Sequence, residues 1–490
     1  MRAGGYVTEI PYTYGHHGEM APARLALALI LAGVRPPPGL LSGRDLAWCE
    51  LGFGQGVTLA VLAAANPGIR FHGTDINPAH AGFASGLASA AGLQNLSVAA
   101  EGFAEYAARA DLPAFDVVTL HGVWSWVGPA ERAAIVGFLR DRLKPGGICH
   151  IAYNALPGLA PLLPLRALMK GSLDRDTGPL PDRIGRAVAF AATLRGQGAR
   201  YFQANPAADD RLRGLAGRPV AYLAHEYFNE DWTPDYVTDV AGALAAAGLT
   251  FAGPARVADR LDTPASGPLA VGVAAILDGL ADPLFREMAG DFLTNRPFRR
   301  DLFVKDPGPL TPAEREEMLE ALPFAPLTAP HRLPGGGTLP HGEAVLDRAA
   351  VAPLLDRVGP AGRIGLLPTA LGHLAPAADP DSVAGRMEAC ARFNAVVLAR
   401  SRTGDTVGAL ASPVLGAGVE LDRVERLFLL ALREGAEPPA FALEALTASG
   451  GGVKREGRPL TGAAALEELA DRWALFRNAR LAVLDRLGVR

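Results

Sequence analysis

Short apolar runs alternate with helical stretches between residues 44 and 154. The runs DLAWCEL, IRFHGTD, LSVAA, FDVVTLH and GICHIAY have the length and apolar content of buried strands. The stretches between them have the spacing of helices, so each strand is joined to the next by a helical crossover. Such a pattern forms a parallel sheet with helices on both faces. The sequence therefore predicts an α/β fold of the Rossmann-like type.

The chain is too long for one ordinary hydrophobic core, because it has 490 residues. After Pro157 the pattern is mainly helical, and the strand candidate RRDLFVK leads into a Pro/Gly linker. We expect a core with an N-terminal arm (1–155), then a helical insertion with a lid and the end of the sheet (156–306). A mainly α C-terminal domain (307–490) follows, in which GRIGLLP is a strand candidate.

Composition restricts the partners and the compartment. The net charge of −4 offers no general attraction to nucleic acid. The longest apolar run near the start, LALALILAGV, is too short to span a bilayer, and no signal peptide is evident. The three cysteines are far apart, and the pair His16 and His17 has no carboxylate at a matching spacing. We expect a cytoplasmic protein that does not bind nucleic acid, does not insert into a membrane and has no metal site.

A glycine-rich turn, CELGFGQG (residues 49–56), follows the first predicted strand. Glycine tolerates positive φ and lets a ligand approach the backbone, and doubly wound proteins bind nucleotide-like ligands at this turn. The dinucleotide pattern GxGxxG would need glycine where Val57 stands. An acid followed by GxGxG is instead the pattern of S-adenosylmethionine enzymes with the class I methyltransferase fold. We expect S-adenosyl-L-methionine as cofactor and S-adenosyl-L-homocysteine as product.

Acidic residues at the strand ends complete the expected cofactor site. Asp75 follows the second strand, where a carboxylate can accept two hydrogen bonds from ribose hydroxyls. Glu101 can accept a hydrogen bond from the adenine amino group, and Glu50 can face the sulfonium or the amino group of the methionine part. The residues assigned to the cofactor are Glu50, Gly52, Gly54, Gly56, Asp75, Ile76, Glu101, Phe103 and His121.

Several longer stretches resemble one family. PYTYGHHGEMAP, GTDINPAHAGFA, HGVWSWV, YNALPG, YLAHEYFNEDWTP and DFLTNRPFRRDLFVK are similar to class I methyltransferases that carry a methyltransferase regulatory domain, a group that includes rickettsial protein-lysine methyltransferases. The resemblance covers residues 6–305. It implies that the N-terminal arm, with Tyr12, Tyr14, His16, His17 and Glu19, closes over the cofactor.

The acceptor site is expected beyond the fourth and fifth strands, at HGVWSWV (121–127) and YNALPG (153–158). A third segment, HEYFNEDW (225–232), mixes acids and aromatic residues in what we expect to be a loop, as a lid over a cationic acceptor would. The residues assigned to catalysis are His121, Asn154 and Glu226. Those assigned to acceptor binding are Tyr14, Trp124, Trp126, Tyr153, His225 and Glu230.

The identity of the acceptor stays open. An amine, on a protein lysine or a small molecule, is the first interpretation, with Asn154 and the acidic lid holding the ammonium. A hydroxyl of a sugar, surface polysaccharide or natural product is the alternative, with His121 as base and the tryptophans stacking on the ring. HGVW stands where DNA amino-methyltransferases have Asn or Asp, Pro, Pro and an aromatic residue, which disfavours DNA. A non-catalytic protein that senses the cofactor is a further alternative, against which the intact glycine turn argues.

The C-terminal helices have apolar stripes, as in LDRVERLFLLALREG. Such stripes need a partner surface. We expect them to form a homodimer or to present the acceptor; a self-contained helical domain is the alternative.

Overall fold

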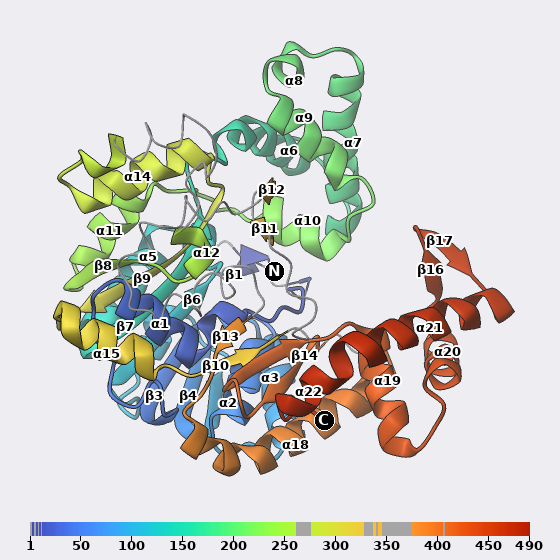
Figure 1. The fold of residues 1–490 in the computed structure, drawn as a ribbon. Helices are drawn as coiled ribbons and strands as arrows, with labels where there is room; N and C mark the ends of the chain where they lie inside the picture. The colour runs from blue at the N-terminus through green and yellow to red at the C-terminus, as the bar shows by residue number, and fades with distance from the viewer. Residues whose placement is uncertain are drawn as a thin grey trace.

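The computed structural model describes residues 2–3, 6–7, 9–10, 12–260, 276–327, 337–339, 342–344, 374–404 and 407–490 (Figure 1). The strand candidate GRIGLLP lies outside these residues. In the described part of the chain, no helix combines the length and the apolar character that crossing a membrane requires.

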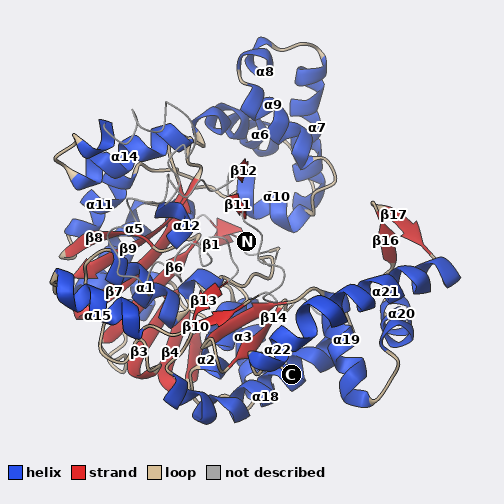
Figure 2. Ribbon diagram, viewed as in Figure 1, coloured by secondary structure: helices blue, strands red, loops and turns tan. Residues whose placement is uncertain are grey.

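A seven-stranded sheet forms the centre of the molecule, in the order β5-β4-β3-β6-β7-β9-β8 (Figure 2). The first five strands pair in parallel, whereas β9 is antiparallel to both of its neighbours. The strands are Arg44–Leu51 (β3), Gly68–Thr74 (β4), Leu96–Ala99 (β5), Phe115–His121 (β6), Leu143–Asn154 (β7), Leu249–Pro254 (β8) and Phe298–Lys305 (β9). The predicted parallel sheet is confirmed, and two further strands extend it.

Helices cover the sheet where the sequence predicts crossovers. They are Pro22–Leu31 (α1), Val57–Ala65 (α2), Pro78–Ala90 (α3), Phe103–Ala107 (α4), Pro129–Arg142 (α5), Val237–Ala245 (α11) and Pro283–Thr294 (α14). Proline occupies the first turn of α1, α3 and α5, where the missing N–H has no partner to lose. The Asn77 side chain caps α3 by accepting the Ala79 N–H at 3.0 Å.

The helical insertion forms a lobe of its own, which projects from the sheet in Figure 1. It consists of Leu163–Asp174 (α6), Leu180–Gly196 (α7), Arg200–Ala204 (α8), Pro206–Leu215 (α9) and Val220–Tyr227 (α10). Its apolar side chains form a separate small core that includes Leu165, Ile184, Leu212 and Phe228. The chain then returns to the sheet through α11 and β8.

The C-terminal part packs against the opposite side of α2 from the sheet. Its main elements are Pro312–Ala321 (α15), Val383–Ser401 (α18), Ala409–Ser412 (β14), Ala417–Glu420 (β15), Arg423–Glu434 (α19), Pro438–Ala448 (α20), Gly462–Phe476 (α21) and Ala482–Arg486 (α22). Contacts from β14, β15 and α18 bury every residue of α2, which explains why VTLAVLAAA is apolar on all faces.

The apolar stripe of α19 is covered within the chain. Leu427, Phe428 and Leu430 are buried in a core that α19 shares with α2 and the sheet. Asp422 and Glu425 form a capping box at the start of α19, and Gly435 ends the helix in the left-handed conformation. This apolar face therefore needs no second molecule to cover it.

Candidate active site

The glycine turn lies between β3 and α2, at the carboxyl edge of the sheet. Gly52, Gly54 and Gly56 have φ angles of 71°, 57° and 68°, in the left-handed region that other residues rarely adopt. A Cβ on Gly52 would lie 2.5 Å from Val123 Cγ2, so a side chain would not fit there. The alternating glycines thus permit a tight turn that leaves the backbone accessible.

A cavity of about 400 Å³ opens beside this turn, a volume within the range of small-molecule sites. It brings together the predicted cofactor residues Glu50, Gly52, Gly54, Asp75, Ile76, Glu101, Phe103 and His121. Gly56 shapes the turn without lining the cavity. The cavity is also lined by residues that had not been assigned to the cofactor, among them Tyr12, His17, Gln55, Glu105, Trp126 and Glu131.

Two buried carboxylate oxygens in this cavity have no hydrogen-bond partner among the described residues, Oε2 of Glu50 and Oε2 of Glu101. The other oxygen of Glu101 receives Arg109 Nη1 at 3.2 Å. Burial, with a smaller contribution from the nearby Asp75 charge, raises the pKa of Glu50 to about 8. Acceptors of this kind fit a ligand with amino groups, as S-adenosylmethionine has at its adenine and methionine ends.

Asp75 is held by three groups of the protein. Its Oδ2 accepts the Gly54 N–H at 2.8 Å, and its Oδ1 accepts the Asn77 N–H at 2.9 Å. His80 Nδ1 lies 3.0 Å from the same Oδ1. The carboxylate is therefore oriented at the cavity wall, and Oδ2 retains capacity for a further hydrogen bond.

The N-terminal arm closes one side of the cavity. Gln55 donates its Nε2 to the Tyr12 carbonyl at 3.1 Å, and the His17 N–H donates to Thr58 at 2.9 Å. From the insertion, His225 Nε2 lies 2.7 Å from the Ile10 carbonyl oxygen. The arm is thus attached both to the glycine turn and to α10.

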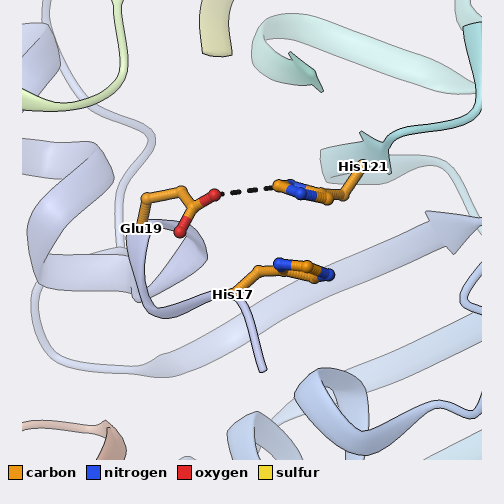
Figure 3. Close-up of side chains that lie close together, drawn as sticks. All are labelled: His17, Glu19 and His121. Atoms are coloured by element: carbon orange, nitrogen blue, oxygen red, sulfur yellow. Dashed lines mark ion pairs between the residues drawn. The ribbon is translucent and has the colours of Figure 1, made fainter. Parts of the chain in front are cut away.

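His17, Glu19 and His121 lie together where the arm meets the end of β6 (Figure 3). His121 Nδ1 is 3.3 Å from Glu19 Oε1, which also accepts Arg300 Nε at 3.1 Å. Burial, and next the neighbouring His17, lower the pKa of His121 well below its ordinary value. Burial by itself raises the pKa of Glu19, but the neighbouring His121 and Arg300 lower it by a larger amount. The net shift of the Glu19 pKa is downward, so the carboxyl is ionised. The site thus holds a neutral imidazole beside a carboxylate.

Potential metal-ligand atoms of these three residues lie within 4.8 Å of one another. This clustering differs from the expectation that the His16–His17 pair has no carboxylate at a matching spacing. The rings of His17 and His121 are stacked, with centroids 3.5 Å apart and planes inclined by 17°. Imidazole coordinates a metal in the plane of its ring, and two nearly parallel planes do not meet at one ion. The geometry therefore favours ring packing over chelation.

The tryptophans of HGVWSWV have different environments. Trp126 lines the cavity and stacks on Trp232, with centroids 6.0 Å apart. Trp124 is buried outside the cavity lining, beneath the Arg132 guanidinium at 4.7 Å.

The residues of YNALPG do not line the cavity. Tyr153 is fully buried, and its hydroxyl donates to Asp301 at 2.7 Å within a network that contains Arg299. The Asn154 N–H donates to Ser125 Oγ at 2.9 Å. The polar groups at the strand end 153–154 thus bind Asp301 of β9 and Ser125 rather than facing the cavity.

The segment HEYFNEDW begins as helix rather than loop, since α10 extends to Tyr227. His225 is buried beside the arm, with its ring against Tyr12 at 5.1 Å. Glu226 lies 3.5 Å from the Tyr12 hydroxyl, and burial raises the pKa of its carboxyl. Glu230 faces the insertion, 3.3 Å from Lys170 Nζ.

Tyr14 is exposed and lies against Phe83, in a groove between the arm and the C-terminal part. Four further residues at or beside the cavity had not been predicted to belong to it: Gln55, His80, Glu105 and Glu131. Glu131 carried one usable signal, since it is an acid in the first turn of the helix that follows HGVWSWV.

Comparisons with known proteins agree with this geometry. Residues 49–149 match a family described as a methyltransferase domain, and residues 219–305 match a predicted methyltransferase regulatory domain. The uncharacterised protein sll1526 of Synechocystis sp. is 34% identical over 507 positions, covering 99% of both chains. Two structures of PKMT2 from Rickettsia typhi, one in complex with AdoHcy, share the fold with TM-scores of 0.66 and 0.63 at 17% identity, covering 98% of this chain and 99% of theirs. The chain belongs to the class I S-adenosylmethionine-dependent methyltransferases that carry a methyltransferase regulatory domain.

Proposed function

We propose that this methyltransferase transfers the methyl group to an amine acceptor. The observation that carries the proposal is the charge of the cavity wall. Four carboxylates line it, those of Asp75, Glu101, Glu105 and Glu131, together with the carboxyl group of Glu50, and among the described residues no lysine or arginine lines it. A wall of this kind favours cations, and both the sulfonium cofactor and an alkylammonium acceptor are cationic.

In the proposed arrangement the cofactor occupies the part of the cavity beside the glycine turn. Gly52, Gly54 and Gly56 allow close approach, Asp75 accepts from the ribose, and Glu101 and Glu50 accept from the two amino groups. Ile76 and Phe103 contribute apolar contacts at the rim. When bound, S-adenosylmethionine supplies an electrophilic methyl group for in-line displacement by the acceptor nitrogen.

The acceptor must lose a proton before or during attack, because a primary alkylammonium has an ordinary pKa of about 10.4. His121 presents a neutral imidazole at the cavity wall, and Glu19 beside it stabilises the imidazolium that forms on proton uptake. We therefore assign proton acceptance to His121, with Glu19 as its positioning residue. The hydrogen-bonded pair of Glu226 and Tyr12 lies at the arm and supports closure of the cavity.

One observation favours a hydroxyl acceptor as the second candidate. Trp126 is one of the residues that line the cavity, and an indole ring there could stack on the face of a sugar or an aromatic ring. His121 would then take the hydroxyl proton.

A labelling experiment separates the two acceptors. Lysate from a strain lacking this gene is incubated with the purified protein and S-adenosylmethionine deuterated in the methyl group, and mass spectrometry locates the label. We expect label on nitrogen, and label found only on oxygen would contradict the amine proposal. Asp75→Ala provides the control, because loss of a charged hydrogen-bond acceptor should weaken S-adenosylhomocysteine binding by about 1.5–3 kcal/mol, measured by calorimetry.

A further inference from the structure

Two carboxylates lie beside Gly128, at the start of α5. Glu131, in the first turn, and Asp231, in the segment after α10, place Oε2 and Oδ2 at 3.2 and 3.1 Å from the position that a Cβ of Gly128 would occupy. Within the described parts of the chain, neither carboxylate forms a hydrogen bond or a salt bridge, and Asp231 interacts with Arg166 only through longer-range electrostatics. The absence of a side chain at Gly128 leaves open the space between them.

The nearest cations are occupied elsewhere. Arg132 pairs with Asp235 at 2.9 Å and lies over the Trp124 ring. Arg166 donates to the carbonyl oxygens of Asn229 and Glu230, with its guanidinium over Trp232. Neither arginine forms a salt bridge with Glu131 or Asp231, although the charge of Arg166 interacts with that of Asp231 over a longer distance.

An aromatic ring completes the surroundings of this pair. Trp126 lines the same cavity as Glu131, and its partner in the stack, Trp232, directly follows Asp231. An ammonium group interacts favourably both with carboxylates and with the face of an indole ring. Two carboxylates and a tryptophan are thus suited to an alkylammonium group.

We propose that Glu131, Asp231 and the ring of Trp126 form the subsite that holds the alkylammonium group of the acceptor. The inference rests on the proposed amine-methylating function and adds the residues that recognise the amine. It also assigns a role to the insertion, which supplies Asp231 to a site otherwise built from the sheet.

The segment that carries Asp231 is fastened to the cavity wall. The Thr233 N–H donates to the Ser125 carbonyl at 2.9 Å, and Asp235 accepts from Arg132 on α5. The Trp126–Trp232 stack fixes the same segment from the other side. Asp231 is therefore held at a defined position rather than on a free loop end.

Acidic residues near a helix N-terminus also stabilise the helix through its dipole, and stability alone would account for their presence. Ligand binding distinguishes the two roles. The full chain, saturated with S-adenosylhomocysteine, is titrated calorimetrically with Nα-acetyl-lysine methylamide, and separately with the uncharged Nε-acetylated form of the same compound. We expect the charged probe to bind at least about tenfold more tightly.

Three variants test the subsite. Glu131→Gln and Asp231→Asn should each weaken binding of the charged probe by at least about tenfold, and Gly128→Ala should weaken it by filling the space between the carboxylates. S-adenosylhomocysteine affinity should stay unchanged in all three. Asp239→Asn, an exposed acid on α11, is the matched control and should bind the probe as the unmodified protein does.

The proposal is overturned if the charged probe does not bind, or if Glu131→Gln and Asp231→Asn bind it unchanged. Turnover separates this failure from failure of the function. Label on nitrogen with an unaltered KM in both variants would contradict the proposed subsite but support an amine acceptor. Label on oxygen alone would contradict the amine acceptor itself. Comparing label in protein and small-molecule fractions distinguishes a lysine side chain from a free amine.

Discussion

The imidazole of His80 lies against the carboxylate of Asp75, with Nδ1 3.0 Å from Oδ1. On the other edge of the ring, Nε2 accepts the backbone N–H of Tyr12 at 3.0 Å. Asp75 in turn accepts the N–H of Gly54. A buried histidine on α3 thereby connects the N-terminal arm with the acid and the glycine turn of the cofactor cavity.

Replacing His80 should weaken cofactor binding although the ring does not line the cavity. His80→Ala removes the partner that orients Asp75 and the anchor of the arm at Tyr12. We expect S-adenosylhomocysteine affinity to fall by roughly tenfold, the effect of losing a charge-assisted hydrogen bond. Calorimetry measures this affinity, and His72→Ala on β4, whose ring packs against Phe115 and not against Asp75, should bind S-adenosylhomocysteine normally. Equal S-adenosylhomocysteine affinity in the two variants would mean that the contacts of His80 with Asp75 and Tyr12 do not contribute to cofactor binding.

Gly418, in β15, controls the position of the arm from the C-terminal part. A Cβ there would lie 2.3 Å from Nε2 of His16, whose side chain is only 4% exposed. Gly418→Ala should displace His16 and with it Gly15 and His17, which line the cavity. We expect a loss of S-adenosylhomocysteine affinity of about three- to tenfold, since arm contacts are weakened rather than removed.

The control for this prediction is Gly452→Ala, because a Cβ at Gly452 would meet no atom within 4 Å. Because a Cβ at Gly418 would also lie 2.9 Å from Cγ1 of the buried Val61, Gly418→Ala should unfold at a somewhat lower temperature, and binding is compared well below both unfolding temperatures. If Gly418→Ala binds the ligand as Gly452→Ala does, the arm does not depend on the C-terminal part.

The buried Glu50 makes stability depend on pH. Its folded-state pKa of about 8 lies above the ordinary value of 4.5, so the folded protein binds the proton more tightly than the unfolded chain. The free energy of unfolding of the ligand-free protein should therefore fall as pH rises from about 4.5 to about 8. The slope from this group is at most about 1.4 kcal/mol per pH unit. Glu50→Gln should remove this contribution, which urea unfolding at several pH values measures. If the unfolding free energy of Glu50→Gln changed with pH as that of the unmodified protein does, Glu50 would not be the group responsible.

Arg386 attaches α18 to the core. Its guanidinium is buried and donates to the carbonyl oxygens of Ala65 and Ser42 at 2.8 and 2.7 Å, and to the Asn66 side chain. Arg386→Met keeps the length of the side chain and removes these donors, leaving buried acceptors unsatisfied. We expect a loss of about 2–4 kcal/mol of unfolding free energy in urea. Arg392→Met, on the exposed face of α18, should change stability by less than about 1 kcal/mol.

Much of the core fold could be predicted from the sequence. The alternation of strands and helices, and the ends of the strands at Asp75, His121 and Asn154, follow from local apolar patterns. The antiparallel insertion of β9 between β7 and β8 could not be predicted, because strand pairing depends on contacts between segments far apart in the chain. That α18, α20 and α21 cover the apolar stripe of α19 could not be chosen over a partner molecule for the same reason.

Some features of the candidate site could likewise be predicted from the sequence, whereas others depend on the tertiary structure. The sequence by itself determined the glycine turn, since glycine adopts the φ angles of residues 52, 54 and 56 without steric cost, and it determined which strand ends border the cavity. It also identified the acidic segment 225–232. Only the tertiary structure decided that Asp231, not Glu230, lies with Glu131 beside Gly128, and that the Tyr153 hydroxyl donates to Asp301 of β9. Local sequence specifies backbone conformation, whereas the direction of a side chain and its partner depend on how distant segments pack.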